Sequence, residues 1–65
     1  MSNTLIKEYF SDDLLRTSMV FFRNGEFRVV CLDSSIESQT EHFFTFAQQA
    51  EDFAEDWVLR ENAPL

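Results

Sequence analysis

The sequence predicts an α+β fold in which a three-stranded antiparallel β-meander packs against one C-terminal α-helix, preceded by a short N-terminal arm or helix. Three patterns predict it: an Asn-Gly pair between two β-rich runs, a third such run after a turn cluster, and helical spacing of apolar residues near the C-terminus. We expect one domain over residues 1–65, with the arm or short helix at 1–16, the meander at 17–44 and the helix at 45–61.

The N-terminal segment has an ambiguous apolar pattern. Leu5, Ile6, Tyr9 and Phe10 fit one face of a short helix, with Thr4 as its N-cap. A strand would instead place Leu5 and Tyr9 on one face and Ile6 and Phe10 on the other. We expect a short helix or an irregular arm.

The dipeptide Asn24-Gly25 predicts a β-hairpin, because both positions of a tight two-residue turn need residues that tolerate positive φ. Pairing outward from this turn sets Arg23 opposite Glu26 and Ser18 opposite Cys31. One face of the hairpin then suits burial under the helix, and it carries Ser18, Val20, Phe22, Phe27, Val29 and Cys31.

The other face of the hairpin carries Met19, Phe21, Val30 and Leu32, and this set is too apolar to lie in open water. Either the N-terminal arm folds over it or a second copy of the chain does. We favour the second copy, since the arm has charged interruptions and no strong helix signal. These four residues are therefore the candidate homodimer face.

A turn cluster, Asp33-Ser34-Ser35, precedes a third predicted strand over residues 39–44. The helix follows, with Thr45 and Gln48 at the spacing of a capping box and Pro64 beyond its end. Its apolar residues recur at helical spacing, namely Phe46, Ala47, Ala50, Phe53, Ala54, Trp57 and Val58. We expect Trp57 and Phe53 to be its main anchors on the sheet.

The net charge of -7 comes wholly from the second half of the chain. Through Leu32 four basic residues balance four acidic ones, whereas from Asp33 onward Arg60 is the one basic residue among eight acidic ones. Such a field repels nucleic acid and attracts a basic protein surface. We expect a protein partner and no direct nucleic-acid binding.

The sequence contains no apolar run long enough to span a bilayer, and its N-terminus lacks the basic region and apolar core of a secretory signal. We therefore expect a cytoplasmic protein that does not bind a membrane.

The residues that could support catalysis are few. Cys31 and His42, with Asp33, could supply a thiolate, a base and an orienting carboxylate. Cys31, however, shares the face predicted to be buried, where cysteine behaves as a small apolar residue. The single glycine belongs to the hairpin turn, which leaves none for a phosphate-binding or calcium-binding loop. We expect no enzyme, no cofactor and no metal site.

The helix carries like charges one turn apart, Glu51 with Glu55 and Asp52 with Asp56, and each pair costs roughly 0.2–0.5 kcal/mol. Leu59 falls between Asp52 and Glu55 on the helical wheel. A solvated helix face would explain the acids alone, and a frayed last turn would equally explain the exposed leucine. An apolar residue ringed by like charges instead favours a docking surface for a basic partner, made of these five residues.

The run EHFFTFAQQAEDFAEDWVL resembles small uncharacterised acidic proteins encoded by bacteriophages, including phages of cyanobacteria. The likeness is one of composition, spans roughly residues 17 to 60 and brings no site residue with it. It implies a protein that binds and redirects a host protein in the host cytoplasm. We therefore expect a non-catalytic protein-binding module, an inhibitor or adaptor, and as the alternative a structural protein that forms a homodimer through the second hairpin face.

Overall fold

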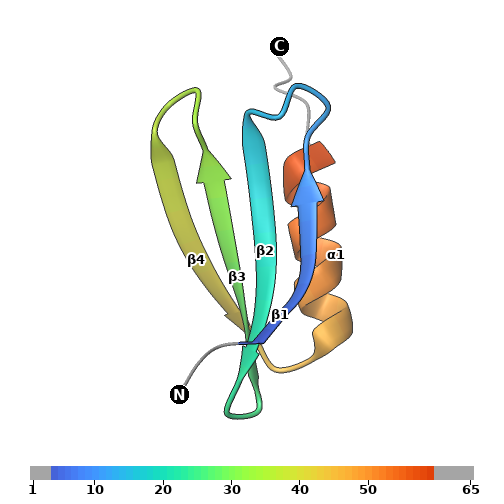
Figure 1. Ribbon diagram of the computed structural model, residues 1–65. Coiled ribbons are helices and arrows are strands. Elements are labelled where there is room, and N and C mark those ends of the chain that lie inside the picture. Colours follow the sequence, from blue (N-terminus) through green and yellow to red (C-terminus); the bar gives the residue numbers. More distant parts are fainter. Residues whose placement is uncertain (1–3, 60–65) are drawn as a thin grey trace.

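A computed structural model of the chain describes residues 4–59. It has four strands and one helix: β1 (Thr4–Phe10), β2 (Arg16–Arg23), β3 (Glu26–Asp33), β4 (Ser38–Phe44) and α1 (Ala47–Leu59). The strands form one antiparallel sheet in the order β1-β2-β3-β4, and α1 lies across one face of it (Figure 1). The α+β class and the meander are confirmed, but the sheet has four strands rather than the three that we expected.

The hairpin of β2 and β3 has the predicted register. Arg23 pairs with Glu26, and the ladder continues two residues beyond Ser18 and Cys31. The turn residues Asn24 and Gly25 have φ values of 54° and 75°, as a two-residue turn with positive φ at both positions requires. This turn determines which residues of the two strands share a face.

The expectation of a helical or irregular arm is wrong for residues 4–10, which form the edge strand β1. A compact turn joins β1 to β2. The Ser11 hydroxyl donates to the Asp13 carboxylate at 2.7 Å and accepts from the Arg16 amide at 3.0 Å, and the same carboxylate accepts from the Leu15 amide at 3.0 Å. These bonds satisfy the polar groups of a tight connection, so the charged residues that seemed to interrupt the arm are those of a turn.

An irregularity in the pairing of β1 with β2 decides where the residues of β1 lie. Leu5 pairs with Phe21 and Lys7 with Val20, so β1 advances two residues while β2 advances one. Such a bulge shifts the alternation of side chains. Leu5 therefore shares a face with Phe10, and Tyr9 lies on the opposite face. Neither the helix pattern nor the strand pattern considered for this segment predicted that arrangement.

The helix begins at Ala47, and the carbonyl of Phe46 accepts the hydrogen bond from the Ala50 amide at 3.2 Å. Phe46 therefore precedes the helix, and its side chain is 64% exposed. The start at residue 45 was predicted two residues too early. The predicted end at residue 61, with Pro64 beyond it, lies outside the described residues.

Small residues, rather than the large aromatic ones, form the centre of the contact between helix and sheet. Ala50 and Ala54 are fully buried and Val58 nearly so, whereas Phe53 and Trp57 are half-buried beside the core. The prediction that Trp57 and Phe53 are the main anchors is therefore corrected, because they flank the contact instead of filling it. Alanine lets the helix backbone lie close to the strands, and α1 packs mainly against β2 and β3.

One buried hydrogen bond ties this contact together. The Ser18 hydroxyl on β2 donates to the backbone carbonyl of Ala54 at 2.8 Å. Around it lie the buried side chains of Val20, Val29 and Cys31. A buried hydroxyl needs such a partner, and this one also determines where the helix lies on the sheet.

Within residues 4–59, no helix lies on the opposite face of the sheet, which points toward the viewer in Figure 1. We call it the open face, and by the strand register its apolar members are Leu5, Phe10, Met19, Phe21, Val30, Leu32 and Phe43. The four residues of the candidate dimer face lie together at its centre, as predicted. The N-terminal arm, which we considered as a cover for this face, instead forms the edge strand β1. It contributes Leu5 and Phe10 to the open face.

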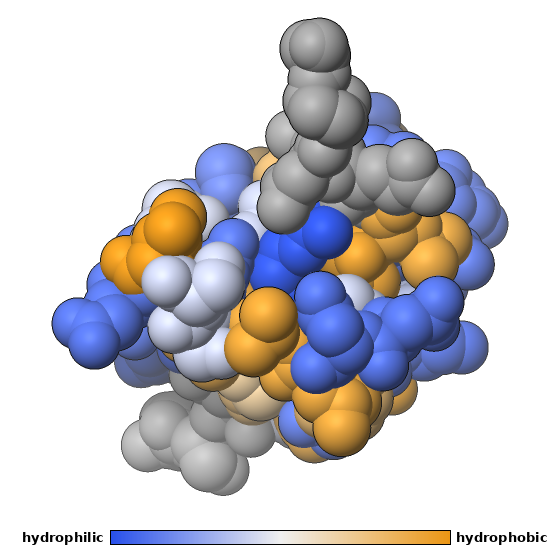
Figure 2. Space-filling model, turned by 90° about the horizontal axis from the view of Figure 1, so that it is seen from above, coloured by the Kyte–Doolittle hydropathy of each residue, from blue (hydrophilic) through white to orange (hydrophobic). Residues whose placement is uncertain are grey.

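Seen from the end that carries the β1–β2 and β3–β4 turns, apolar surface lies between hydrophilic side chains (Figure 2). The turns at this end include Leu14 and Ile36, each 70% exposed. Among residues 4–59, α1 is too short and too polar to cross a membrane.

Candidate functional site

The five predicted partner-binding residues lie on the side of α1 that faces away from the sheet. Ala50, Ala54 and Val58 face the strands, and Phe53 and Trp57 pack beside them. The acidic positions lie on the remaining side of the helix, with Glu51 at its edge. We call the following set the acidic helix surface: Glu51, Asp52, Glu55, Asp56 and Leu59. All are exposed except Glu51, which is half-buried, and Leu59 is 60% exposed.

One hydrogen bond along α1 reaches an acid of this surface. The amide of Gln48 donates to the Asp52 carboxylate at 2.9 Å, one turn along the helix. Within residues 4–59, no lysine or arginine lies at ion-pair distance from Glu51, Asp52 or Glu55. Repulsion among Glu51, Asp52 and Glu55 is therefore not offset by a direct ion pair with a lysine or arginine of the described residues.

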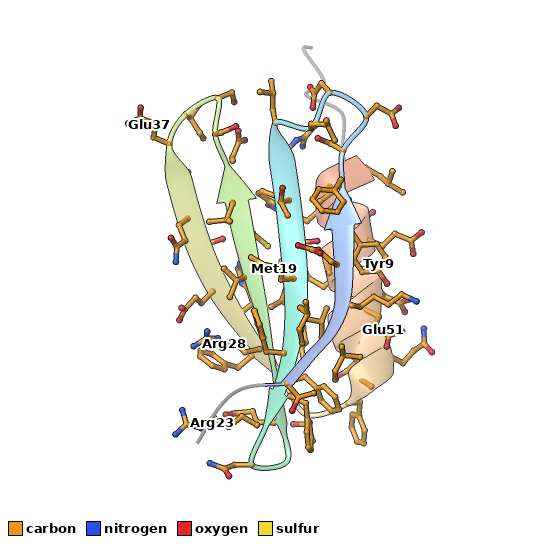
Figure 3. All side chains as sticks on the ribbon, in the orientation of Figure 1. Tyr9, Met19, Arg23, Arg28, Glu37 and Glu51 are labelled. Atoms are coloured by element: carbon orange, nitrogen blue, oxygen red, sulfur yellow. The ribbon has the colours of Figure 1, made fainter. Side chains whose placement is uncertain are left out.

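Tyr9 on β1 extends this surface beyond the helix. Its side chain is half-buried beside α1, on the same side of the molecule as Glu51 (Figure 3). Burial raises the pKa of the Tyr9 phenol, and the negative charges of Glu51, Glu55 and Asp52 raise it further. Tyr9 therefore lies close enough to these three carboxylates to sense their charge, at the seam between α1 and β1.

Sequence reasoning did not find Tyr9 as a neighbour of the acids. The strand pattern placed Tyr9 on the same face as Leu5, and the bulge in β1 reverses that relation. A bulge has no reliable signature in a single seven-residue run. The useful signal was the turn cluster after Phe10, which marks the preceding residues as one strand of a hairpin.

This arrangement can bind a cationic surface but offers little for covalent chemistry. Carboxylates attract and orient lysine and arginine side chains, while Tyr9 and Leu59 offer apolar area. Among the described residues, no group of three or more His, Cys, Asp or Glu side chains is placed to hold a metal ion.

The residues considered for thiol chemistry are used elsewhere in the fold. Cys31 is 1% exposed beneath α1. The His42 ring packs against Phe53 with centroids 4.5 Å apart and lies 3.2 Å from the Thr40 hydroxyl. The Asp33 carboxylate accepts from the amide and the hydroxyl of Ser35, at 3.0 Å and 2.6 Å, which holds the β3–β4 turn. His42 therefore lies on the helix-covered face of the sheet.

Comparison with known proteins gives no relative from which a function could be carried over. No protein-family model, no curated protein and no solved structure matches this chain. The resemblance to phage proteins therefore has no support beyond the sequence run that suggested it.

Proposed function

We propose that this protein is a non-catalytic protein-binding module whose acidic helix surface docks on a basic surface of another protein. It acts as a small inhibitor or adaptor, and in the phage setting that the sequence run suggests, its partner is a host protein in the host cytoplasm. The module needs no cofactor. It does not bind nucleic acid directly, because its net negative charge repels phosphates.

The observation that carries the proposal is the concentration of carboxylates around Tyr9. Glu51, Glu55 and Asp52 all raise the pKa of the Tyr9 phenol. A helix face selected only for stability would alternate acids with lysines at this spacing, since each like-charge pair costs roughly 0.2–0.5 kcal/mol. The surface is thus less stable than a neutral one would be, and binding a basic partner would offset that cost.

Charged and apolar residues have different roles in this mode of binding. Carboxylates around a docking site raise the rate of encounter with a basic partner, and salt weakens this effect. Exposed apolar groups mainly control the dissociation rate, because their contacts form only in the docked complex and must be broken before it separates. Leu59 and Tyr9, at the margins of the acids, are the apolar anchors in this proposal.

The test reverses charge on the docking surface and, as a matched control, elsewhere. The first variant is Asp52→Lys with Glu55→Lys. The control is Glu26→Lys with Glu37→Lys, which changes the net charge by the same amount at two exposed positions, the first residue of β3 and the β3–β4 turn. Glu37 lies far from Glu51 of α1 (Figure 3). Each protein is immobilised, partners are captured from a cell extract at low and high salt, and bound proteins are quantified by mass spectrometry.

We expect the helix variant to lose a partner that the parent and the control both retain, and high salt to release that partner from the parent. We also expect the helix variant to be as stable as the parent or slightly more stable, because the substitutions relieve repulsion along α1. Binding and stability would then change in opposite directions. Retention of the same partner at parental levels by the helix variant at low salt would contradict the proposal.

A further inference from the structure

We propose that a second copy of this chain covers the open face, giving a dimer of four layers in which two sheets pack together and the two helices lie outside. This inference concerns a different surface from the acidic helix surface and does not depend on the function proposed for that surface. It extends the candidate dimer face of four residues to all four strands.

The open face has apolar residues on all four strands, interspersed with polar and charged ones. Phe10 and Leu5 on the edge strand β1 are 53% and 48% exposed, and Phe43 on the opposite edge strand β4 is 55% exposed. Between them Met19 and Phe21 are half-buried by their own neighbours. Exposed aromatic and aliphatic side chains on both edge strands of one face favour a face that is covered rather than one left in water.

The size of the face fits a dimer interface. Its strands are seven or eight residues long. At a rise of about 3.3 Å per residue and a strand spacing of about 4.8 Å, the face measures on the order of 25 Å by 19 Å. Two such faces in contact bury on the order of 1,000 Å², which reaches the lower range of specific protein–protein interfaces.

Charge decides which surface a second copy can approach. The open face and its hairpin end carry two cations, Arg23 and Arg28, against three carboxylates, Glu8, Glu26 and Glu41. This near balance allows the face to meet another copy of itself. The acidic helix surface has four carboxylates and would repel its own copy. A second copy of the chain therefore fits the open face and not the helix.

The arginine at the centre of the open face lies along the sheet instead of projecting from it. The guanidinium of Arg28 lies 5.5 Å from the centre of the Phe21 ring, and its Nη1 lies 3.8 Å from a carboxylate oxygen of Glu41. The Nε atom of Arg28 is covered by surrounding atoms and has no hydrogen-bond partner within the described chain. The guanidinium therefore covers part of Phe21 and is matched with an acid on its own face, so it does not project toward a partner.

Pairing along sheet edges would leave the open face in water. The edge strand β1 is interrupted by its bulge and carries Lys7 beyond it, and both features discourage a further strand from pairing there. Face-to-face packing uses both edges of the sheet at once, because Phe10 and Phe43 lie on opposite edge strands. An edge-to-edge dimer would involve β1 or β4 but not both in one contact.

The first test measures mass against concentration by analytical ultracentrifugation for the parent, Phe10→Glu, Phe43→Glu and the control Phe46→Glu. All three phenylalanines are more than half exposed, at 53%, 55% and 64%, so circular dichroism should show that each variant folds. Phe46 precedes α1 and lies outside the open face. We expect a parent dimer, dissociation constants raised at least about tenfold for Phe10→Glu and Phe43→Glu, and little change for Phe46→Glu.

The second test measures the distance between the two helices. A spin label on Glu55→Cys lies on the exposed side of α1, while Cys31 is buried and escapes labelling. With three layer spacings of about 10 Å between the helices, we expect labels at least about 30 Å apart.

Three results would overturn the proposal. One is a monomer at every concentration that can be reached. Another is a dimer that is insensitive to Phe10→Glu or to Phe43→Glu, which would indicate pairing through one edge. The last is a label distance below about 20 Å, which would indicate a dimer formed through the helices or with both helices on one side of a continuous sheet.

Discussion

The two faces of the sheet have similar apolar content but opposite environments. On one face Val20 and Val29 are completely buried under a helix whose own contact residues are alanines. On the other, no described segment lies over Met19, Phe21 or their neighbours (Figures 1 and 3). The covered face is closed by the chain itself, whereas the open face is shielded only by neighbouring side chains of the same sheet.

This difference separates stability from association. Substitutions on the helix-covered face should act on the free energy of unfolding, because they disturb the one core that the monomer has. Substitutions on the open face should act mainly on binding to a second copy. A domain of this length is stabilised by roughly 3–10 kcal/mol at 0.05–0.15 kcal/mol per residue, so single changes suffice to distinguish the two cases.

The largest contrast is expected between neighbouring valines of β3. Val29 is 0% exposed under α1, and Val30 is 6% exposed on the open face. Val29→Asp would bury an unpaired carboxylate in a closed core, and we expect an unfolded protein. In Val30→Asp the carboxylate has only a layer of side chains between it and water, so we expect a folded, destabilised monomer. Circular dichroism with thermal melting distinguishes these outcomes, and two equally unfolded variants would contradict the contrast.

The next effect concerns the aromatic residues that flank the helix. Trp57 packs beside the core and is half-buried, and we expect Trp57→Ala to lower the free energy of unfolding by about 3 kcal/mol, near the low end for a large aromatic residue. Phe46→Ala is the control, since Phe46 is 64% exposed, and it should cost less than about 0.5 kcal/mol. Urea denaturation measures both. Equal losses for the two variants would mean that Trp57 contributes no more to packing than an exposed aromatic residue does.

The sequence predicted the parts of the fold that local chemistry controls. Asn24-Gly25 determines the hairpin register, and the alternation that follows from it correctly separates Val29 from Val30. The spacing of apolar residues correctly located a helix between residues 47 and 59. In both cases a few neighbouring residues carry the whole signal, so a single sequence is enough.

The errors arose where tertiary contacts decide the structure. Residues 4–10 have both helix and strand patterns, and pairing with β2 selects the strand. Likewise, helical spacing shows which residues face the sheet but not how closely the helix approaches it. The close approach places Ala50 and Ala54 at the centre and moves Trp57 to the side. The acidic residues were found from sequence, but their relation to Tyr9 depends on a bulge that the sequence does not reveal.

A smaller effect on stability should separate the two faces at adjacent positions of β2. Ser18 donates its buried hydrogen bond to the Ala54 carbonyl under the helix, whereas Thr17 lies on the open face. We expect Ser18→Ala to cost about 1 kcal/mol, because the hydrogen bond is lost and its acceptor has no access to water. Thr17→Ala should cost less than about 0.5 kcal/mol. If chemical denaturation gave the same loss for both, the Ser18 hydroxyl would not be anchoring the helix.

The smallest effect expected is a change in the pKa of Tyr9, the single tyrosine of the chain, which absorbance near 295 nm can follow during alkaline titration. Burial raises the pKa of the phenol, and Glu51, Glu55 and Asp52 contribute in that order. Glu51→Gln should therefore lower the pKa of Tyr9 toward its ordinary value. Glu41→Gln, the same change on the open face, should leave the pKa where the parent has it. Salt should reduce the difference between Glu51→Gln and the parent, since exposed charges are screened within about 3 Å at 1 M ionic strength.

The sign of the accompanying pH dependence follows from the direction of the Tyr9 shift. A folded-state pKa above the ordinary value of 10.0 means that the folded protein holds the phenolic proton more tightly than the unfolded chain does. The resulting stability is fully present below the unfolded-state pKa and is lost as pH rises through the folded-state pKa. Glu51→Gln should weaken this alkaline loss, and Glu41→Gln should not. If both variants left the titration of Tyr9 unchanged, the field of the acidic helix surface would not reach β1, and the seam between α1 and β1 would lose its place in the proposed docking site.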